Sequence, residues 1–307
     1  MSFKILKTDR QVPTYIMEKT KAAQNRYSTE KTEHLRNKVV CIKVGGNALT
    51  DQQVKANIIL QIYELVQLGV KPVLIHGGGI EIKQLLDEVG IESEFIGGHR
   101  KTDLLSIKYI EMALSGLVNK ELVSLLNRAG LKAVGISGKD GGLIKAIKRT
   151  HIEIVNSKEI ISDLGFVGDV SEIDPSVIHT LLDAGFLPVI SPVSSGSNGE
   201  TFNINADMFA GHLAGALKAE NFVALTNIDG LLEDLDKPDS LIDSLTIESA
   251  KKLFGTVIQG GMIPKIESCF IALENGVKSA HIINGTKNHT LLRILLSMDK
   301  IGTTISR

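Results

Sequence analysis

The stretch VVCIKVGGNAL, residues 39–49, decides the fold prediction. It begins as an apolar run rich in β-branched side chains, carries the cation Lys43 and stops at the pair Gly45-Gly46. Such a run predicts a buried strand followed by a tight turn. Residues without a Cβ let a phosphate approach main-chain N–H groups closely, and Lys43 would add a positive charge beside it. An ordinary turn has the same local pattern, so this stretch alone leaves both interpretations open.

The stretch VLIHGGG, residues 73–79, repeats the design in a second apolar run that ends in glycines. Between the two, apolar residues recur at helical spacing over residues 51–68, which predicts a helix buried on one side. Strand, helix and strand form the βαβ unit of a parallel sheet. Ligands bind such sheets beyond the carboxyl ends of the strands, where glycine turns and helix N-termini offer N–H donors to anions. Together the two stretches favour an anion site over two unrelated turns.

The composition fits an α/β protein and argues against nucleic acid as a partner. The chain has 307 residues, enough for one large domain or two lobes with a sizeable core. Its formal net charge is −1, and it has 29 Gly, an aromatic fraction of 4% and no Trp. Such a chain offers no basic surface for a polyanion and few aromatic rings on which bases could stack.

The cysteines and the hydropathy pattern indicate the compartment. Cys41 lies in a predicted core strand and Cys269 in a predicted helix, and no CxxC or Cys/His spacing occurs. The two thiols therefore support neither a disulfide framework nor a zinc site. No apolar stretch is long enough to span a bilayer, and the N-terminus lacks a hydrophobic signal core. We expect a cytoplasmic protein without a membrane partner.

The rest of the chain continues the alternation of helices and strands. Residues 144–170 alternate short β-like runs with turns, which predicts hairpins laid over the sheet edge. The low-complexity stretch SSGSNG, residues 194–199, is where we place a boundary between two lobes. The further elements expected from periodicity are helices over 79–89, 103–129, 175–184, 207–218 and 246–254, and strands over 133–136, 187–191, 222–226 and 279–283.

The predicted organisation has three parts. Residues 1–38 form a helical extension, residues 39–198 an N-lobe and residues 199–307 a C-lobe. The extension has apolar residues at helical spacing, so it either packs on its own domain or docks on another subunit.

Three charged residues beyond the first strands are candidates for a site. Arg100 stands in the Gly-rich loop 95–103, which is either a solvated turn or a place for bidentate capture of a carboxylate. Asp207 falls in the first turn of a predicted helix, where Asp commonly caps the N-terminus. Lys265 follows Gly260-Gly261 at another helix start, where a cation is unfavourable against the helix dipole unless it binds an anion.

Taken in order along the chain, these motifs resemble the amino acid kinase family. Each motif is weak by itself, but the ordered set, from about residue 39 to the C-terminus, is specific. The resemblance implies an α/β fold: a three-layer αβα sandwich with an open, mainly parallel sheet of about eight strands, plus an N-terminal helix. The motifs are Lys43 with Gly45-Gly46, His76-Gly77-Gly78-Gly79, Arg100, the stretch LGFVGDV at 164–170, Asn203-Ile204-Asn205-Ala206-Asp207 and Gly260-Gly261 through Lys265.

The resemblance also implies an activity and a role for each matching residue. It implies phosphoryl transfer from MgATP to the γ-carboxylate of N-acetyl-L-glutamate, a step of arginine biosynthesis. The N-lobe would bind the acylated amino acid and form a dimer, and the C-lobe would bind ATP. Lys43 and Lys265 would hold the transferring group, and Asp207 would orient both lysines. The acyl amino acid would be bound by Gly78, Gly79, Arg100 and Asn203, and the nucleotide by Gly45, Gly46, Asn227, Gly230 and Leu231.

The chemistry of such a transfer agrees with this residue set. An ionised carboxylate needs no general base to attack phosphorus. The reaction needs cations and N–H donors that neutralise the phosphoryl oxygens and align two anions. Mg²⁺ would be bound through the nucleotide phosphates and stay largely hydrated, so we expect no dedicated metal site in the protein.

The resemblance bears on assembly and regulation as well. Family members that arginine inhibits carry an N-terminal helix that joins dimers into a hexamer, and residues 1–38 could supply it. We therefore expect a homo-oligomer, either a dimer or a hexamer built as a trimer of dimers. At the arginine site His281 is kept, but Ile294 and Lys300 replace the expected Glu and Gly. The sequence therefore leaves inhibition by arginine open.

Two other functions fit the same residues. The first is a related kinase acting on another N-acylated or carrier-bound acidic amino acid, or on aspartate, glutamate or carbamate. The second is a non-catalytic sensor on the same fold. The sensor is the weaker alternative because it would have no physical reason to keep two lysines aimed at one point. A dinucleotide oxidoreductase is disfavoured because no G-x-G-x-x-G motif follows a strand.

Overall fold

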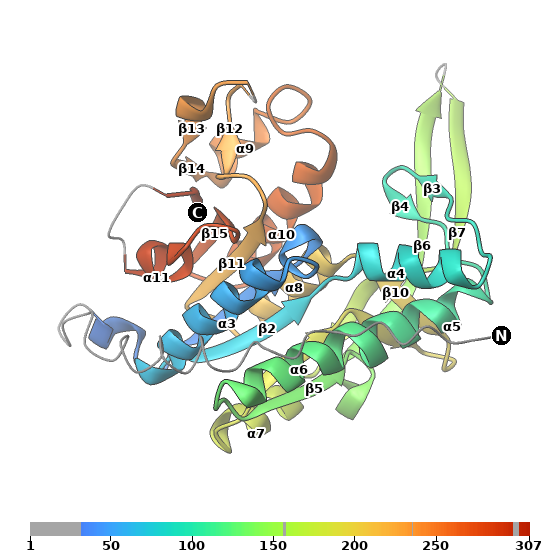
Figure 1. Ribbon diagram of the computed structural model, residues 1–307. Coiled ribbons are helices and arrows are strands. Elements are labelled where there is room, and N and C mark those ends of the chain that lie inside the picture. The colour runs from blue at the N-terminus through green and yellow to red at the C-terminus, as the bar shows by residue number, and fades with distance from the viewer. Residues whose placement is uncertain (1–31, 156–157, 235, 297–300) are drawn as a thin grey trace.

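The architecture is taken from a computed structural model that describes residues 32–155, 158–234, 236–296 and 301–307. An eight-stranded sheet with the order β14-β16-β15-β11-β1-β2-β8-β5 forms its centre (Figure 1). Within it only the β15–β16 pair is antiparallel among the described residues. The open, mainly parallel sheet predicted from the sequence is confirmed. Its strands are β1 Val39–Val44, β2 Lys71–His76, β5 Ala133–Ser137, β8 Leu187–Ser191, β11 Asn221–Thr226, β14 Ser244–Thr246, β15 Ser279–Asn284 and β16 Thr303–Ser306.

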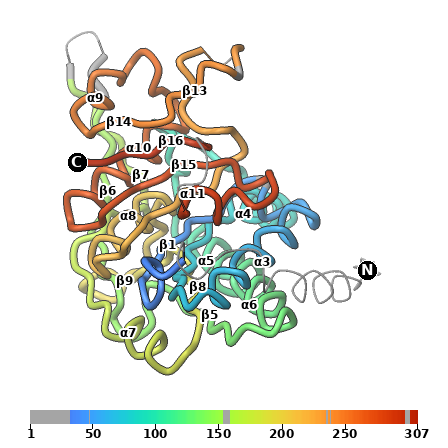
Figure 2. The backbone as a smooth tube through the Cα atoms, turned by 90° about the vertical axis from the view of Figure 1, so that its left-hand side faces the viewer, coloured from blue at the N-terminus to red at the C-terminus, as the bar shows by residue number. Residues whose placement is uncertain are grey.

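Helices cover both faces of this sheet (Figure 2). One face packs against α3, α6 and α11, and the other against α7, α8 and α10. The three-layer αβα arrangement is therefore confirmed. The helices are α3 Gln52–Gln67, α4 Gly79–Glu88, α5 Ser106–Glu111, the π-helix Met112–Val118, α6 Asn119–Arg128, α7 Ser176–Asp183, α8 Ala206–Ala216, α9 Ile247–Lys251, α10 Ile263–Glu274 and α11 Thr290–Leu295. Short 3₁₀ turns span Glu33–Leu35, Gly46–Ala48, Asp140–Gly142, Pro238–Ser240 and Gly260–Met262.

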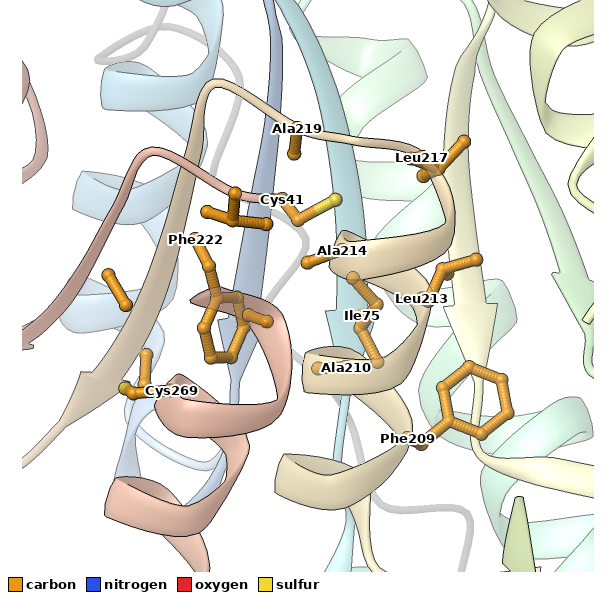
Figure 3. Close-up of a cluster of buried hydrophobic side chains, with 14 of the residues drawn as sticks. Cys41, Ile75, Phe209, Ala210, Leu213, Ala214, Leu217, Ala219, Phe222 and Cys269 are labelled. Carbon is orange, nitrogen blue, oxygen red and sulfur yellow. The ribbon is translucent and has the colours of Figure 1, made fainter. Parts of the chain in front are cut away.

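Alternation along β1 decides which side chains face which helices. Cys41 belongs to the core that packs α8 and α10 on the sheet, as Figure 3 shows, whereas Val40 and Ile42 belong to the core on the other face. Because successive side chains of a strand point to opposite faces, Lys43 shares the face of Cys41. Lys43 therefore lies on the face of β1 that packs against α8.

A long hairpin projects from the body of the molecule beside the short hairpin of β3 Phe95–Ile96 and β4 His99–Arg100 (Figure 1). Its strands are β6 Ile144–Val155 and β7 Lys158–Ile173, which pair in antiparallel fashion with two register shifts. Together with β9 Val193–Gly196 and β10 Thr201–Ile204 they close a small barrel. The hairpin itself was predicted, but the prediction of several short strands is wrong. Polar residues interrupt the apolar alternation of both strands, but pairing with the neighbouring strand keeps them in the extended conformation.

Other expectations from the sequence fare unevenly. The helix expected over 103–129 contains a π-helical segment between α5 and α6, and α9 is shorter than the predicted 246–254. Residues 194–196 belong to β9 and residues 197–199 to its turn into β10, and the division into two lobes stays a prediction. The helix expected within 1–38 falls mostly on 1–31, outside the described residues. Within the described ranges, no helix is long and apolar enough to cross a membrane.

The remaining strands are short pairs. They are β3 Phe95–Ile96 with β4 His99–Arg100, and β12 Leu231–Leu232 with β13 Leu241–Ile242. Cys41, predicted in a core strand, and Cys269, predicted in a helix, are both buried free thiols. Burial raises the pKa of each thiol well above its usual range, so neither is poised as a nucleophile.

Candidate active site

The carboxylate of Asp207 binds two lysines that lie far apart in the sequence. Lys43 Nζ is 2.8 Å from Asp207 Oδ1, and Lys265 Nζ is 3.0 Å from Asp207 Oδ2. Lys43 stands near the carboxyl end of β1, Asp207 in the first turn of α8 and Lys265 in the first turn of α10. The structure therefore brings together the three residues that were predicted to act on the transferring group.

Close packing of α8 on α10 places Asp207 beside Lys265. Gly211, one turn after Asp207, faces Ser268, and a Cβ at Gly211 would lie 2.4 Å from the carbonyl oxygen of Ser268. Ser268 in turn follows Lys265 by three residues and so lies on the same side of α10. A side chain at position 211 would push the helices apart. Gly211 therefore allows the close packing that brings Asp207 within reach of Lys265.

The N-terminus of α8 is capped by Asn205 rather than by Asp207. The Asn205 side-chain oxygen accepts hydrogen bonds from the N–H groups of Asp207, at 2.9 Å, and Met208, at 3.3 Å. An N-cap satisfies donors that a helix start leaves free. The interpretation of Asp207 as a simple cap is therefore wrong, and its carboxylate is left for the two lysines.

The electrostatics of this cluster favour a bound anion. Lys43 and Asp207 are each only 6% exposed. Burial by itself raises the pKa of Asp207, but Lys43 and Lys265 outweigh it and hold that pKa below its usual value. Burial lowers the pKa of Lys43, and the Asp207 carboxylate opposes that effect. With the groups in their charged forms, two cations surround one carboxylate, which leaves a net positive charge in a buried place.

A first cavity, about 250 Å³ in volume, opens at Lys43 and Asp207. The glycine turns after β1 and β2 and the segment leading into α8 line it. All residues predicted to bind an acyl amino acid line this cavity, namely Gly78, Gly79, Arg100 and Asn203. Gly45 and Gly46 line it as well. The structure thus places these two glycines beside Lys43 rather than with the other residues expected to contact the nucleotide.

Arg100 forms part of the wall of the first cavity. The segment expected as a Gly-rich loop is the β3–β4 hairpin, which also carries Phe95 and His99. The Arg100 guanidinium donates hydrogen bonds to the carbonyl of Gly79, at 3.2 Å, and to the hydroxyl of Ser93, and lies 4.7 Å from the centre of the Phe95 ring. The interpretation as a solvated turn is therefore wrong, because these contacts hold the guanidinium against the cavity.

A second cavity, about 370 Å³ in volume, lies beyond the carboxyl end of β11. Asn227, Gly230 and Leu231, predicted to contact a nucleotide, all line it, together with Lys265. Because Lys265 binds Asp207, and Asp207 lines the first cavity, the ion pair stands where the two cavities meet.

Neighbouring strands fix the loop that lines the second cavity. The Leu231 N–H donates to Thr303 Oγ1 at 2.8 Å, and the Thr303 hydroxyl donates to the carbonyl of Ile242 at 2.7 Å. On the other side, the Asp229 carboxylate accepts from Asn284 Nδ2 at 2.8 Å and from Lys287 Nζ at 2.7 Å. These contacts come from β16 and from the end of β15, so distant parts of the chain shape this loop.

The sequence analysis did not predict the apolar residues that line the first cavity. Leu114 and Val167 line the first cavity, although their spacing alone is that of core residues. In the second cavity it missed Gln259, whose amide donates to the carbonyls of Gly255 and Thr256 at 2.9 and 2.8 Å. Its place directly before a glycine pair was the only signal for it in the sequence.

Known proteins resemble this chain over most of its length. Residues 38–284 match the model of the amino acid kinase family. A protein named acetylglutamate kinase from Heliobacterium modesticaldum is 46% identical over 272 residues, which cover 87% of this chain and 92% of that protein.

Solved structures share the fold. The crystal structure of smu.665 from Streptococcus mutans UA159 has a TM-score of 0.71 at 28% identity, over 87% of this chain and 98% of that one. N-acetylglutamate synthase from Neisseria gonorrhoeae, complexed with coenzyme A and N-acetyl-glutamate, has a TM-score of 0.75 at 25% identity, over 93% of this chain and 63% of that one. The family match over most of the sequence and the shared sheet lead to one conclusion: the chain belongs to the amino acid kinase family.

Proposed function

We propose that this protein transfers the γ-phosphoryl group of ATP to the γ-carboxylate of N-acetyl-L-glutamate, a step of arginine biosynthesis. The observation that carries the proposal is the double ion pair of Asp207 with Lys43 and Lys265 where two cavities meet. Similarity to a protein named acetylglutamate kinase, 46% identical over 87% of this chain, supports the same activity.

The first cavity suits an acylated acidic amino acid. Its volume of about 250 Å³ fits a molecule of that size, and Arg100 offers a planar pair of donors for the α-carboxylate. Gly78 and Gly79 bring backbone groups close to the ligand, and Asn203 offers an amide that can donate and accept. A free amino acid would bring an ammonium group, which the positive charge of Lys43 and Arg100 disfavours.

The second cavity suits the nucleotide. Its lining consists mostly of uncharged side chains and of backbone groups in two loops, as a base and a sugar require. The nucleotide phosphates would then extend toward Lys265. The glycines Gly45 and Gly46, beside Lys43, would donate N–H groups to the transferring phosphoryl group.

The transfer itself is a displacement at phosphorus. A γ-carboxylate oxygen forms a bond to the γ-phosphorus, the bond from that phosphorus to the bridging oxygen breaks, and ADP leaves with the electron pair. Lys43 and Lys265 neutralise charge on the phosphoryl oxygens, and Asp207 keeps both ammonium groups in place. Such groups, held in advance, stabilise the transition state without reorganising during the reaction.

Mg²⁺ enters this scheme with the substrate, as MgATP. Among the residues that the structure describes, no group of three or more His, Cys, Asp or Glu side chains could hold a metal ion. Both oxygens of Asp207 already bind lysines. The proposal therefore gives the cation to the phosphate oxygens and to water, which is the usual coordination of Mg²⁺ in such sites.

Hydroxylamine trapping tests the proposal. The protein is mixed with MgATP, hydroxylamine and N-acetylglutamate, N-succinylglutamate, glutamate or aspartate, and hydroxamate and ADP are measured with and without arginine. We expect a strong signal with N-acetylglutamate that disappears in Lys43→Ala. A stronger signal with N-succinylglutamate would favour the related-kinase alternative. Folded protein that binds ATP yet gives no hydroxamate with any acid would contradict the proposal and favour a sensor.

The arginine arm of that experiment addresses the open question of feedback. Ile294 is buried in α11, and Lys300 lies outside the described residues. An aliphatic side chain at position 294 offers no carboxylate for a guanidinium group. An unchanged rate in the presence of arginine would fit this substitution.

We further propose that the protein is a cytoplasmic homo-oligomer, either a dimer or a hexamer. Large apolar side chains are exposed just before α5, where Leu105 is 51% exposed, and along the π-helix, where Met112 is 58% exposed. Exposed apolar side chains gathered in one region indicate an interface with another chain. Light scattering of the wild type and of Met112→Glu gives the molar mass. A monomeric wild type would rule the oligomer out.

A further inference from the structure

His76, the last residue of β2, is a buried histidine with no role in the scheme above. It has no exposed surface, and it directly precedes the turn Gly77-Gly78-Gly79 that lines the first cavity. Its Nδ1 lies 2.8 Å from the carbonyl oxygen of Gly77, and its Nε2 lies 3.1 Å from Nδ2 of Asn119, the first residue of α6. A buried polar side chain with two defined partners in contact with a cavity wall calls for an explanation.

The partners of Asn119 fix the tautomer of His76. Asn119 Nδ2 also lies 2.9 Å from the carbonyl oxygen of Val189, and Asn119 Oδ1 accepts from Lys120 Nζ at 3.1 Å. The amide nitrogen is therefore the donor, so His76 Nε2 accepts and Nδ1 carries the proton. Burial lowers the pKa of His76 to about 4, so the ring is neutral at pH 7. The imidazole thus donates its one N–H to the carbonyl of Gly77.

This hydrogen bond orients the peptide that enters the cavity wall. The C=O and N–H of a trans peptide point in opposite directions, so the bond to the Gly77 carbonyl turns the Gly78 N–H away from the imidazole. Leu114 and Val118 of the π-helix Met112–Val118 pack against the same turn. A Cβ at Gly78 would lie 2.7 Å from Leu114 Cδ2 and 3.2 Å from Val118 Cγ2. The turn is therefore held between the imidazole and this helix.

The π-helix Met112–Val118 explains how one helix makes both contacts. Leu114 meets Gly78, and Asn119, five residues later, meets His76. In a regular α-helix residues five apart differ by about 140° around the axis. A π-helix closes its hydrogen bonds between residues five apart, which brings such residues toward one face. The wide turns thus bring Leu114 and Asn119 to the same end of β2.

Strand β5 leaves room for the amide of Asn119. A Cβ at Gly135 would lie 2.0 Å from Asn119 Oδ1, so no other residue type fits there without displacing the amide. Lys120 Nζ bridges the same place, because it donates to the carbonyl of Gly135 at 2.8 Å as well as to Asn119. Each member of the network is thus satisfied, as a buried polar network requires.

We propose that His76 and Asn119 are positioning residues for the acyl amino acid, and that the π-helix exists to bring Asn119 and Leu114 to the glycine turn together. Their hydrogen bonds hold the Gly77–Gly78 peptide in the orientation that the ligand meets. This inference rests on the proposed function and adds to it the residues that support its acyl amino acid site.

Two substitutions of His76 separate its two hydrogen bonds. An Asn side chain places its amide near the former Nδ1, so His76→Asn keeps the donor to Gly77. A Gln side chain reaches the former Nε2, so His76→Gln keeps the bond to Asn119 and loses the one to Gly77. We expect His76→Gln to raise the KM for N-acetylglutamate on the order of tenfold, the value of one hydrogen bond. We expect His76→Asn to raise it less, and neither to change the KM for ATP.

A merely structural role predicts a different result. Both variants would then lower the free energy of unfolding alike and leave the KM for N-acetylglutamate unchanged, which would overturn the proposal. Gln61→Leu is the matched control, because it removes the buried side-chain oxygen that accepts from the Leu291 N–H at 2.8 Å, away from both cavities. It should lower stability without a change in either KM.

Nitrogen NMR of the wild-type ring gives a test that needs no activity. We expect the signal of a neutral imidazole protonated at Nδ1 between about pH 5.5 and 8, because the ring titrates below that range. Protonation at Nε2 in the wild type would overturn the inference even if the enzyme is active. An inactive wild type with the Nδ1 tautomer would instead contradict the proposed function.

Discussion

The two cavities at the carboxyl edge of the sheet are built differently. Three charged side chains held by secondary structure meet in the first, since Lys43 stands on β1, Asp207 on α8 and Arg100 on the β3–β4 hairpin. The second is lined mostly by uncharged and backbone groups of two loops, to which Glu233 and Lys265 add charges of opposite sign. Charged side chains that must contact one another at a fixed point are positioned more precisely by helices and strands than by loops. A cavity that holds a base and a sugar can be shaped by loops, provided that neighbours fix them.

The largest effect is expected from Lys43→Ala, which removes the buried cation that distinguishes the first cavity from the second. Loss of this buried cation should lower kcat by on the order of a thousandfold, because it removes charge stabilisation in the transition state. The KM for ATP should stay the same, because Lys43 does not line the second cavity. Steady-state kinetics measures both. Lys139→Ala, which removes a lysine paired with Glu111 at 2.7 Å, is the control. Equal loss of nucleotide affinity would show that the cavities do not act separately.

Arg100→Gln should weaken only the first cavity. We expect the KM for N-acetylglutamate to rise roughly ten- to hundredfold, the value of hydrogen bonds to a charged group. Lys101→Gln removes a neighbouring exposed cation paired with Glu94 and should leave that KM unchanged. If both substitutions had the same small effect, Arg100 would contribute only to the general charge of the surface.

Acid should destabilise both halves of the sheet through one buried histidine in each. Burial lowers the pKa of His76 on β2 and of His281 on β15 to about 4. Unfolded histidines have a pKa near 6.5, so below that pH the unfolded chain binds more protons. The free energy of unfolding should therefore fall as pH drops from about 6.5 toward about 4, by about 2 kcal/mol for each histidine at pH 5.

Urea denaturation at pH 7 and pH 5 measures that loss. His281→Gln should remove its own share of the pH dependence while His76 keeps the other share. His281 bonds only with Thr304 Oγ1 and Asn221 Oδ1, each at 3.0 Å, among the contacts of the described residues. An identical pH dependence in wild type and variant would mean that His281 titrates normally in the folded protein.

The smallest effect is expected from Thr303→Val, which loosens a loop of the second cavity. The substitution removes the acceptor of the Leu231 N–H and should raise the KM for ATP about fivefold, since one neutral hydrogen bond contributes about 1 kcal/mol. The KM for N-acetylglutamate should not change. Thr304→Val, one residue along β16, is the matched control. A rise in both KM values after Thr303→Val would indicate that the loop supports the whole edge of the sheet.

The fold was largely predictable because its signals are local. The apolar runs ending in glycine at residues 39–46 and 73–79 indicate parallel strands by composition alone, and the helices between them follow from periodicity. The hairpin β6–β7 was less predictable. Its ladder is stabilised by pairing between strands, and a single strand does not reveal how far its partner extends.

The candidate site was predictable in its members and less so in its arrangement. Lys43, Asp207 and Lys265 could be named because glycine turns and helix starts mark them. That Asp207 binds both lysines, while Asn205 caps the helix, depends on the contact of α8 with α10 at Gly211. Nothing in the local sequence distinguishes a capping Asp from one bound to lysines.

The sequence by itself determined the order of strands and helices, the glycine turns at their ends and the charged residues that stand there. These properties follow from side-chain volume, backbone freedom and periodicity over a few neighbouring residues. Only the tertiary structure decided that Gly45 and Gly46 line the first cavity, that a π-helix interrupts the long helix, and that His76 bonds with Asn119. Each of these depends on contacts between residues far apart in the chain, where packing and buried hydrogen bonds outweigh local preference.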